Sequence, residues 1–258
     1  MTEFVRQELR NARFERVDLT GASFIGVDLA NVSIRSSDLT GLRVRGSDLA
    51  DIDIHGWLDG SVRINGVDVT PLVNAELDRR YPDRAKMRPT TVDGFREAWD
   101  ALERLWGETV HHARRLDPPL LHESVEGEWS FIETLRHLLF ATDAWILRAM
   151  LGDPAPWDPL DLPWDEMPDT PGIPRDRAAR PSLDEVLALR AGRAATVRRV
   201  VDELTDERLA ASTEPVHGAG WPPAQSFPVR ECLLTVLNEE WEHRLYAERD
   251  LAVLEDRG

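Results

Sequence analysis

The sequence is poor in the residues that build disulfide frameworks or cysteine-based metal sites. Cys232 is the only cysteine among 258 residues, which excludes an intrachain disulfide bond and any zinc site that needs several thiolates. Lysine is equally rare, because Lys86 is the only one. Positive charge therefore comes almost wholly from arginine, a usage typical of GC-rich bacterial coding rather than of one chemistry.

The chain also lacks a basic surplus and a long apolar run. Its net charge is -16, whereas binding to nucleic-acid backbones or anionic membranes needs a basic surface. The start, MTEFVRQELR, has no apolar core of a signal peptide, and no apolar run reaches the length of about 18 residues that a membrane span needs. We therefore expect a cytoplasmic protein without nucleic-acid or membrane partners.

Residues 11–55 follow a period of five, visible in VDLTG, VDLAN, SDLTG and SDLAD. This period matches neither a helix nor an alternating strand, and it is typical of a solenoid whose units pack on their neighbours. A larger apolar residue marks each unit: Phe14, Leu19, Phe24, Leu29, Ile34, Leu39, Val44, Leu49 and Ile54. The run resembles pentapeptide-repeat proteins, which implies a right-handed, four-sided β-helix of little more than two coils.

A short folding or docking module is the simplest interpretation of this solenoid. Its acidic charge also suits a DNA mimic that binds a topoisomerase, but two coils are too short to imitate a useful length of duplex. The stretch after the repeats could cap the solenoid. It predicts a hairpin turn at Asn65 and Gly66, then a short helix with Thr70 as N-cap and Pro71 at the first helical position.

From about residue 91 the apolar spacing becomes helical. Ser130 with Glu133, and Ser182 with Glu185, each form the sequence pattern of a capping box that starts a helix. Four helices are expected, near residues 93–116, 130–151, 182–201 and 229–254. The predicted fold is thus a two-part α+β chain: a β-helix with its cap at 1–68, a linker with a short helix at 69–90, and a four-helix bundle at 91–258.

The connection at residues 152–181 holds eight of the 17 prolines. Such a segment is too long for a hairpin between helices, so we expect it to run the length of the bundle and leave the second and third helices parallel. Trp157 and Trp164 predict that it packs on the bundle. Whether it covers a pocket is left open by the sequence.

Three residues stand out on the second and fourth predicted helices. His137 falls on a buried apolar stripe, and Glu239 and His243 are four residues apart, which places them on one helix face. A buried carboxylate is costly unless it is paired or bound to metal. The three residues are therefore either a hydrogen-bonded polar cluster or the ligands of a catalytic metal site with one open position.

EWSFIETLRHLL together with ECLLTVLNEEWEHRLYAERDL resembles the DinB/YfiT-like family of four-helix bundles, over roughly residues 91–254. In that family a histidine of helix two, after a Trp-Ser helix start, binds a metal with two side chains four apart on helix four. A Glu and His pair there is similar to the mycothiol-dependent maleylpyruvate isomerase branch. The resemblance implies that His137, Glu239 and His243 bind a divalent metal, with zinc as the first candidate and nickel as the second.

The resemblance also implies a reaction. Family members of known activity use a low-molecular-weight thiol, mycothiol or bacillithiol, for transfer or isomerisation. A divalent metal with an open position lowers the pKa of the thiol, and the thiolate attacks a small-molecule substrate that is an electrophile. Glu133, one turn before His137, is a candidate partner for that histidine in addition to its capping role. Arg244 and Tyr246 are candidates for contacts with substrate.

The remaining side chains of the fourth helix have simpler interpretations. Glu240 and Glu242 are expected to face solvent, and Cys232 lies too far from Glu239 to be a ligand, so we expect it in the core.

Two functions compete with a thiol-dependent enzyme. One is a non-catalytic metal-binding or stress-response protein. The other is an interaction module that works through the repeats, with the helical part as a dimerisation platform, and a homodimer is compatible with both halves.

Overall fold

The computed structural model describes residues 3–35, 37–56, 58 and 60–257. The chain divides into two compact units, Met1–Trp57 and Leu58–Gly258. The predicted domain boundaries at residues 68 and 90 fall inside the second unit and stay predictions, and the outermost predicted bounds, residues 1 and 258, lie outside the described residues. Within the described ranges, every helix is too short or too polar to span a bilayer.

In the N-terminal unit the five-residue period becomes a series of turns. The backbone N–H of Ala12 donates to the carbonyl of Leu9 at 3.0 Å, and the same contact recurs every ten residues along the unit. A positive φ recurs every five residues, with position 36 outside the described part: Arg6, Asn11, Arg16, Gly21, Gly26, Asn31, Gly41, Gly46 and Asp51. Aspartate side chains close alternate turns by accepting from the amide two residues on: Asp18 from Thr20, Asp28 from Ala30 and Asp38 from Thr40.

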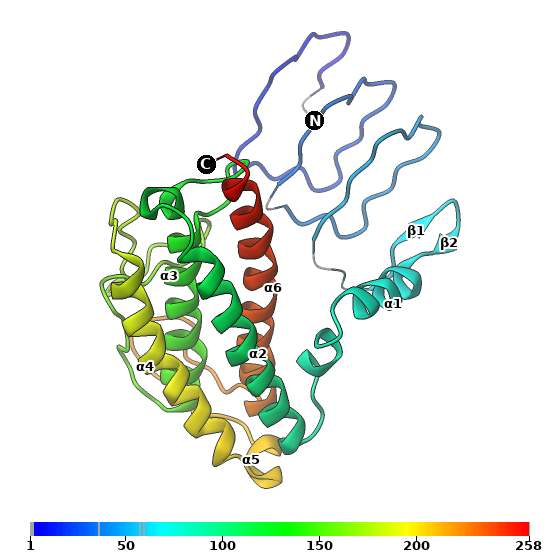
Figure 1. The fold of residues 1–258 in the computed structure, drawn as a ribbon. Coiled ribbons are helices and arrows are strands. Elements are labelled where there is room, and N and C mark those ends of the chain that lie inside the picture. Colours follow the sequence, from blue (N-terminus) through cyan, green and yellow to red (C-terminus); the bar gives the residue numbers. More distant parts are fainter. Residues whose placement is uncertain (1–2, 36, 57, 59, 258) are drawn as a thin grey trace. The chain divides into compact units, whose positions relative to one another are not determined.

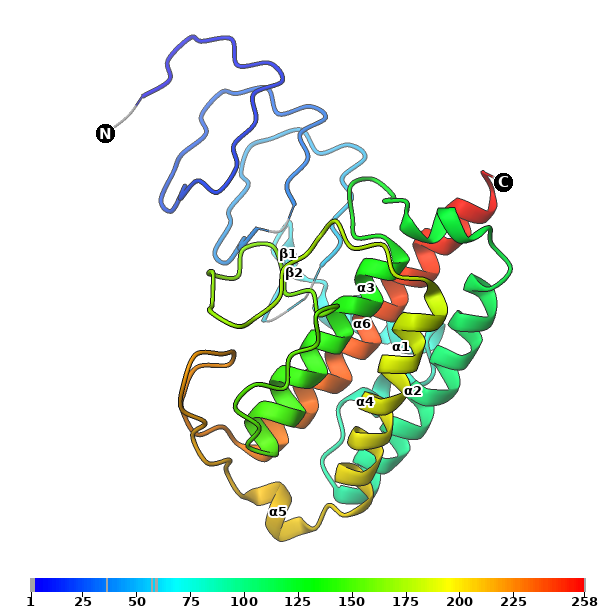
Figure 2. The ribbon, with the colours of Figure 1, turned by 90° about the vertical axis from the view of Figure 1, so that its left-hand side faces the viewer.

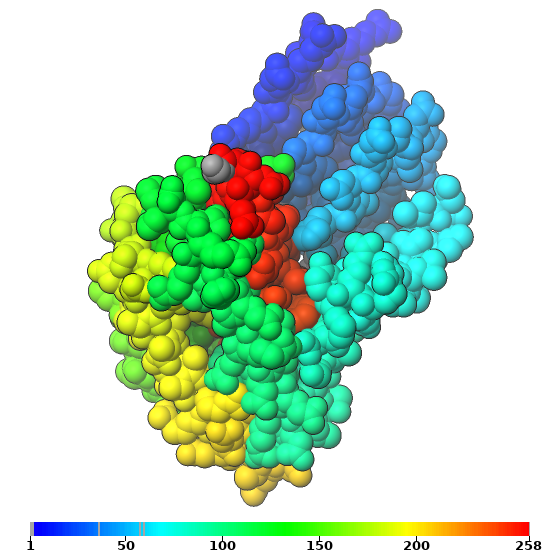
Figure 3. Space-filling model, in the orientation of Figure 1, coloured from blue at the N-terminus to red at the C-terminus, as the bar shows by residue number. Residues whose placement is uncertain are grey.

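The stacked β-helix predicted for this unit is not confirmed. Residues 3–35 and 37–56 contain no assigned strand, and the larger apolar residues of the repeats, from Phe14 to Ile54, are 45–69% exposed. In the space-filling view the coils of this unit stand as separate strips (Figure 3). Stacked coils would bury these side chains against one another, which is the packing that a solenoid needs.

A two-stranded hairpin opens the C-terminal unit. Strands β1 (Arg63–Ile64) and β2 (Val67–Asp68) pair antiparallel. The turn between them consists of Asn65 and Gly66, both with positive φ, which is the geometry that a two-residue hairpin favours. The predicted turn is therefore confirmed.

Helix α1 (Thr70–Arg80) follows the hairpin, and its start corrects the predicted cap. The N-cap residue is Val69, which makes no side-chain cap, and Thr70 is already helical. The hydroxyl of Thr70 instead accepts from the backbone N–H of Val62 at 2.8 Å. Thr70 as N-cap was wrong because this contact with the hairpin takes up its oxygen.

Four long helical segments pack side by side in the C-terminal unit (Figure 1). Both predicted capping boxes are formed, at Ser130 with Glu133 and at Ser182 with Glu185. The long segments are α2 (Val92–Ala113), α3 (Phe131–Thr142) with a π-helical continuation (Asp143–Met150), α4 (Leu183–Asp202) and α6 (Val229–Glu255). Besides α1, the short ones are α5 (Asp206–Ala210) and two 3-10 helices (Arg84–Met87 and Pro118–His122).

The predicted apolar face of α2 packs into the core of this unit. Phe95, Trp99, Leu102 and Trp106 are at most 8% exposed, while Val110 is half-buried. At about 25 cal/mol per Å² of apolar surface, burial of such large side chains is the main source of stability for the helical part.

The proline-rich segment between α3 and α4 runs back along the length of these helices. Figures 1 and 2 show that α3 and α4 point the same way, as the length of the connection predicts. Arg136 of α3, fully buried, holds this segment through its backbone. Its guanidinium donates to the carbonyls of Leu160 at 2.8 Å, Asp176 at 2.6 Å and Ala179 at 3.5 Å.

A buried pair of aspartates lies where this segment meets the π-helical continuation of α3. Arg193 of α4 binds both carboxylate oxygens of Asp143, at 3.0 and 2.8 Å. Asp161, the second aspartate, is fully buried beside the ion pair of Asp143 and Arg193. Burial, together with the negative charge of Asp143, raises the pKa of Asp161 to about 9, so its carboxyl stays protonated at neutral pH.

Asp161→Asn is expected to stabilise the protein increasingly as the pH rises. An aspartate in the unfolded chain loses its proton near pH 4, whereas folded Asp161 keeps it to about 9. The stability that wild-type Asp161 contributes is therefore complete below pH 4 and is lost as the pH rises toward 9. Urea unfolding should give the asparagine variant an advantage of more than about 1 kcal/mol at pH 8 and a smaller one at pH 5. Parallel pH profiles would contradict a protonated Asp161.

Candidate metal centre

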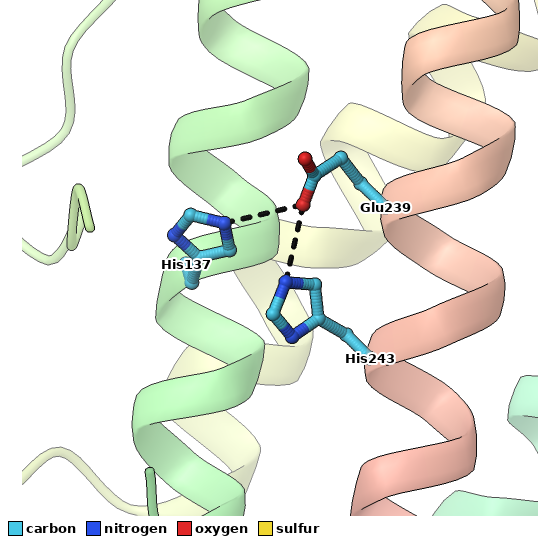
Figure 4. Close-up of side chains that lie close together, drawn as sticks. All are labelled: His137, Glu239 and His243. Carbon is cyan, nitrogen blue, oxygen red and sulfur yellow. Dashed lines mark hydrogen bonds and ion pairs between the residues drawn. The ribbon is translucent and has the colours of Figure 1, made fainter. Parts of the chain in front are cut away.

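Three side chains from two helices converge in the C-terminal unit (Figure 4). His137 comes from the middle of α3, and Glu239 and His243 lie one turn apart on α6. One carboxylate oxygen of Glu239 is 3.3 Å from Nε2 of His137 and 3.1 Å from Nε2 of His243. In the part of the chain that the structure describes, no other cluster of three His, Cys, Asp or Glu brings its ligand atoms within 4.8 Å of one another.

A backbone contact fixes the ring of His137. Its Nδ1 lies 3.0 Å from the carbonyl oxygen of Leu162, and a carbonyl can only accept, so Nδ1 carries the proton. In the neutral ring, Nε2 then points a lone pair at the carboxylate of Glu239. Two acceptors facing each other at 3.3 Å require a proton or a cation between them. The donor set therefore fits a metal ion, and a carbonyl behind a ligating histidine is a common support in such sites.

The charges at the site also suit a cation. Burial would raise the pKa of Glu239, but hydrogen bonds from the two imidazole rings, made when each Nε2 carries a proton, outweigh that effect and hold the pKa far below its usual range. A metal cation in place of those protons would keep the carboxylate charged in the same way. Burial lowers the pKa of His243, which favours its neutral form. One carboxylate and imidazole nitrogens are ligands that zinc accepts, and they must be deprotonated to bind.

Aromatic rings enclose the two histidines. Trp129, just before α3, stacks on His243 with ring centroids 5.7 Å apart and planes 12° apart, and its ring lies 4.5 Å from that of His137. The ring of Tyr246 is nearly perpendicular to that of His243, with ring centroids 5.9 Å apart. The side chain of His137 is 7% exposed, whereas those of His243 and Glu239 are 19% and 29% exposed. The side chain of His137 is thus nearly closed to solvent, while those of His243 and Glu239 are partly accessible.

The other predicted candidates lie in different surroundings. Tyr246 is at the site through its contact with His243. Glu133 uses its carboxylate in the capping box, where it accepts from the backbone and hydroxyl of Ser130. Arg244 is directed to Glu248, at 3.9 Å. The roles of Glu133 and Arg244 toward a metal or substrate stay predictions.

Two expectations for neighbouring side chains of α6 have opposite outcomes. Cys232 is fully buried, as predicted, and burial raises its pKa to about 11. Glu240 was expected to face solvent, which is wrong, because it is 3% exposed. Its carboxylate pairs with Arg190 of α4 at 2.7 Å, a partner 50 residues away that no local pattern of the sequence indicates.

Sequence reasoning did not identify the carbonyl of Leu162 as a support for His137. Leu162 lies in the proline-rich segment, 25 residues from the histidine, and a backbone acceptor leaves no signal in residue type. The tryptophans of that segment were the available hint, because they predicted that the segment packs on the helices. Trp164, half-buried, does so through its contact with Phe140 of α3.

Comparison with known families gives two matches. The model of the DinB superfamily matches residues 101–247, more than half of the chain. The model of pentapeptide repeats matches residues 8–51 in eight copies. Searches of the curated proteins and of the solved structures find no match.

Proposed function

Because the chain belongs to the DinB superfamily, we propose that His137, Glu239 and His243 bind a divalent metal and that the protein is a thiol-dependent enzyme. The observation that carries this proposal is the placement of the His137 ring, with Nδ1 3.0 Å from the carbonyl oxygen of Leu162 and Nε2 3.3 Å from the carboxylate of Glu239. The carbonyl of Leu162 holds the ring so that Nε2 faces the carboxylate of Glu239. A cation shared by these atoms and His243 removes the conflict between the two acceptors.

Zinc is the metal that this donor set suits best, and nickel is the alternative. Three protein ligands leave a position for a further ligand, the arrangement of catalytic rather than structural zinc sites. When bound, the metal would lower the pKa of a coordinated thiol, so that thiolate is present at neutral pH.

We propose a low-molecular-weight thiol of the mycothiol type as the cosubstrate, and a small electrophile as its target. In S-transfer the thiol loses its proton, its sulfur forms a bond to carbon, and the leaving group departs with the electron pair of the broken bond. In isomerisation the sulfur adds to a double bond and leaves again after rotation. The side chains of Trp129 and Tyr246 would shield the reacting sulfur from water.

The same family membership supports a finer description of the C-terminal unit as a four-helix bundle. In this description α2, α3, α4 and α6 form the bundle, and the ligands lie on the facing sides of α3 and α6. For the repeat segment we keep the proposal of a β-helix, supported by its eight matched repeats.

Cobalt substitution tests the proposed function. The Co²⁺ form of the wild-type protein should show visible absorption typical of a low-symmetry site, and added N-acetylcysteine should produce a sulfur-to-cobalt charge-transfer band. The band requires a sulfur atom bound to the metal. A spectrum that N-acetylcysteine leaves unchanged would show that the site has no open position and would remove the basis for thiol chemistry.

A further inference from the structure

A row of aromatic rings leads away from His137. Phe140, one turn further along α3, lies 6.2 Å from the ring of His137. Trp157 stacks on Phe140 at 5.7 Å with planes 22° apart, and Trp164 contacts Phe140 at 6.1 Å. Trp221 meets Trp164 edge-on at 5.0 Å. We call Phe140 and these three tryptophans the aromatic cluster; all its contacts fall in the range of favourable ring pairs.

The exposure within the cluster is uneven. Phe140 is only 2% exposed, while Trp157, Trp164 and Trp221 are all half-buried. A small core beneath a long connection is the simplest reason for such a cluster. That reason accounts for Phe140 and for the buried part of each tryptophan, since all three pack against this core. The part of each ring that stays open to solvent is available to a ligand.

Two buried arginines hold the segments that carry the tryptophans. Arg136 binds the backbone of the proline-rich segment, as described above. Arg148, fully buried in the π-helical continuation of α3, donates to the carbonyl of Pro154 at 2.5 Å. It also donates to Val216 at 3.0 Å and Gly218 at 3.1 Å, in the segment that carries Trp221.

The proline-rich segment therefore supports both the aromatic cluster and the metal centre. The segment with Trp157 and Trp164 also supplies the carbonyl of Leu162 that fixes His137. Proline restricts its backbone further, since 152–181 holds eight of the 17 prolines. Rings held in place before a ligand arrives bind at a low cost in conformational entropy. A rigid set of half-exposed tryptophans next to a reactive centre is suited to recognise a flat ligand.

We propose that the aromatic cluster is a subsite for an uncharged, planar aromatic group of the electrophile, adjacent to the metal centre. The inference rests on the proposed function for the identity of the ligand as an electrophile. It narrows the substrate from any small electrophile to one with an aromatic ring. Trp157 and Trp164 would determine this preference for an aromatic ring, because their partly exposed rings can contact the ligand whereas Phe140 is buried.

The aromatic preference can be measured without any metal. Benzyl alcohol and cyclohexylmethanol are uncharged and similar in size, and NMR titration of each into the full-length protein gives their relative affinities. Each contact between two aromatic rings strengthens binding by about 2- to 12-fold, in addition to the contribution of the apolar area that it buries. We expect benzyl alcohol to bind about fivefold more tightly. Trp157→Leu and Trp164→Leu should each reduce this preference, and Trp157→Phe should retain most of it.

A matched control lies elsewhere in the same unit. Tyr81 is an exposed aromatic residue whose ring contacts Trp241 on α6, so Tyr81→Leu should leave the preference unchanged. Equal affinities of the two alcohols for the wild-type protein would overturn the subsite. A preference that survives both tryptophan-to-leucine changes would overturn it as well, since another surface would then bind the ring.

A second titration separates the subsite from the proposed function. Benzyl mercaptan and cyclohexylmethanethiol, added to the Co²⁺ form, should show the same preference through the charge-transfer band. The band without the preference would reject the aromatic subsite and keep the thiol site. A preference between the alcohols, with no band from either thiol, would support the subsite as an aromatic-binding surface and reject the proposed function.

Discussion

Glu239→Gln is expected to weaken zinc binding by more than about 100-fold. Residues that only orient a ligand change metal affinity by about 10–100-fold, and Glu239 supplies the one negatively charged ligand atom between two histidines. Glutamine keeps the size of the side chain but loses its charge. Competition with a chromophoric zinc chelator gives the affinity of each variant.

Glu248→Gln is the matched control for this change. Glu248 lies on the same helix and faces one histidine, His112, at 3.2 Å, but has no part in the three-residue cluster. Its replacement should leave the zinc affinity within about threefold of wild type, far below the effect of losing a ligand. An equal loss in both variants would attribute zinc binding to the charge of the helix surface rather than to His137, Glu239 and His243.

Arg148→Met is expected to destabilise the folded protein by about 3–5 kcal/mol. Methionine fills a similar volume but provides no donor for the carbonyls that the guanidinium now binds. Buried acceptors without a donor each cost about 1–3 kcal/mol. Urea unfolding, followed by circular dichroism, measures the free energy of unfolding.

Arg198→Met on α4 gives the comparison for this prediction. Arg198 pairs with Asp100 and Glu103 on the surface of the helices, and exposed ion pairs contribute at most about 1 kcal/mol. The Arg148 variant should therefore unfold at a clearly lower urea concentration than the Arg198 variant. Similar midpoints would mean that the segments around Pro154 and Val216 keep their places without Arg148.

The sequence predicted those features that depend on neighbours along the chain. The capping boxes at Ser130 and Ser182 and the hairpin turn at Asn65 involve residues at most three positions apart, so local patterns suffice. The pairing of Glu239 with His243 follows from the helix period in the same way. The position of His137 beside them came from a family resemblance, since spacing alone left a hydrogen-bonded polar cluster as the alternative to a metal site.

Features that depend on distant partners were missed. Glu240 is buried because Arg190 of another helix meets it, and Thr70 is diverted from capping by Val62 in the hairpin. The π-helical continuation of α3 was not predicted either, because its sequence reads as an ordinary helix to about residue 151. Such segments are frequent at functional sites, and this one carries Arg148, which holds two connections beside the candidate metal centre.

For the repeat segment, too, the sequence predicted local structure but not contacts between distant residues. Its five-residue period correctly indicated a regular series of turns, because each turn forms within a few residues. Stacking of the coils depends on contacts between residues about 20 positions apart in a four-sided coil. The sequence of a single repeat does not predict those contacts. In this structure the apolar residues of the repeats are exposed.

Metal content is the measurement that tests the central claim most directly. Wild-type protein and His243→Ala, both purified without a histidine tag, should be analysed by elemental mass spectrometry after equilibration with zinc and removal of the excess. The account predicts about one zinc per wild-type chain and almost none in the variant, because two remaining ligands hold zinc weakly. Wild-type protein without metal would contradict it, and His137, Glu239 and His243 would then form a hydrogen-bonded polar cluster.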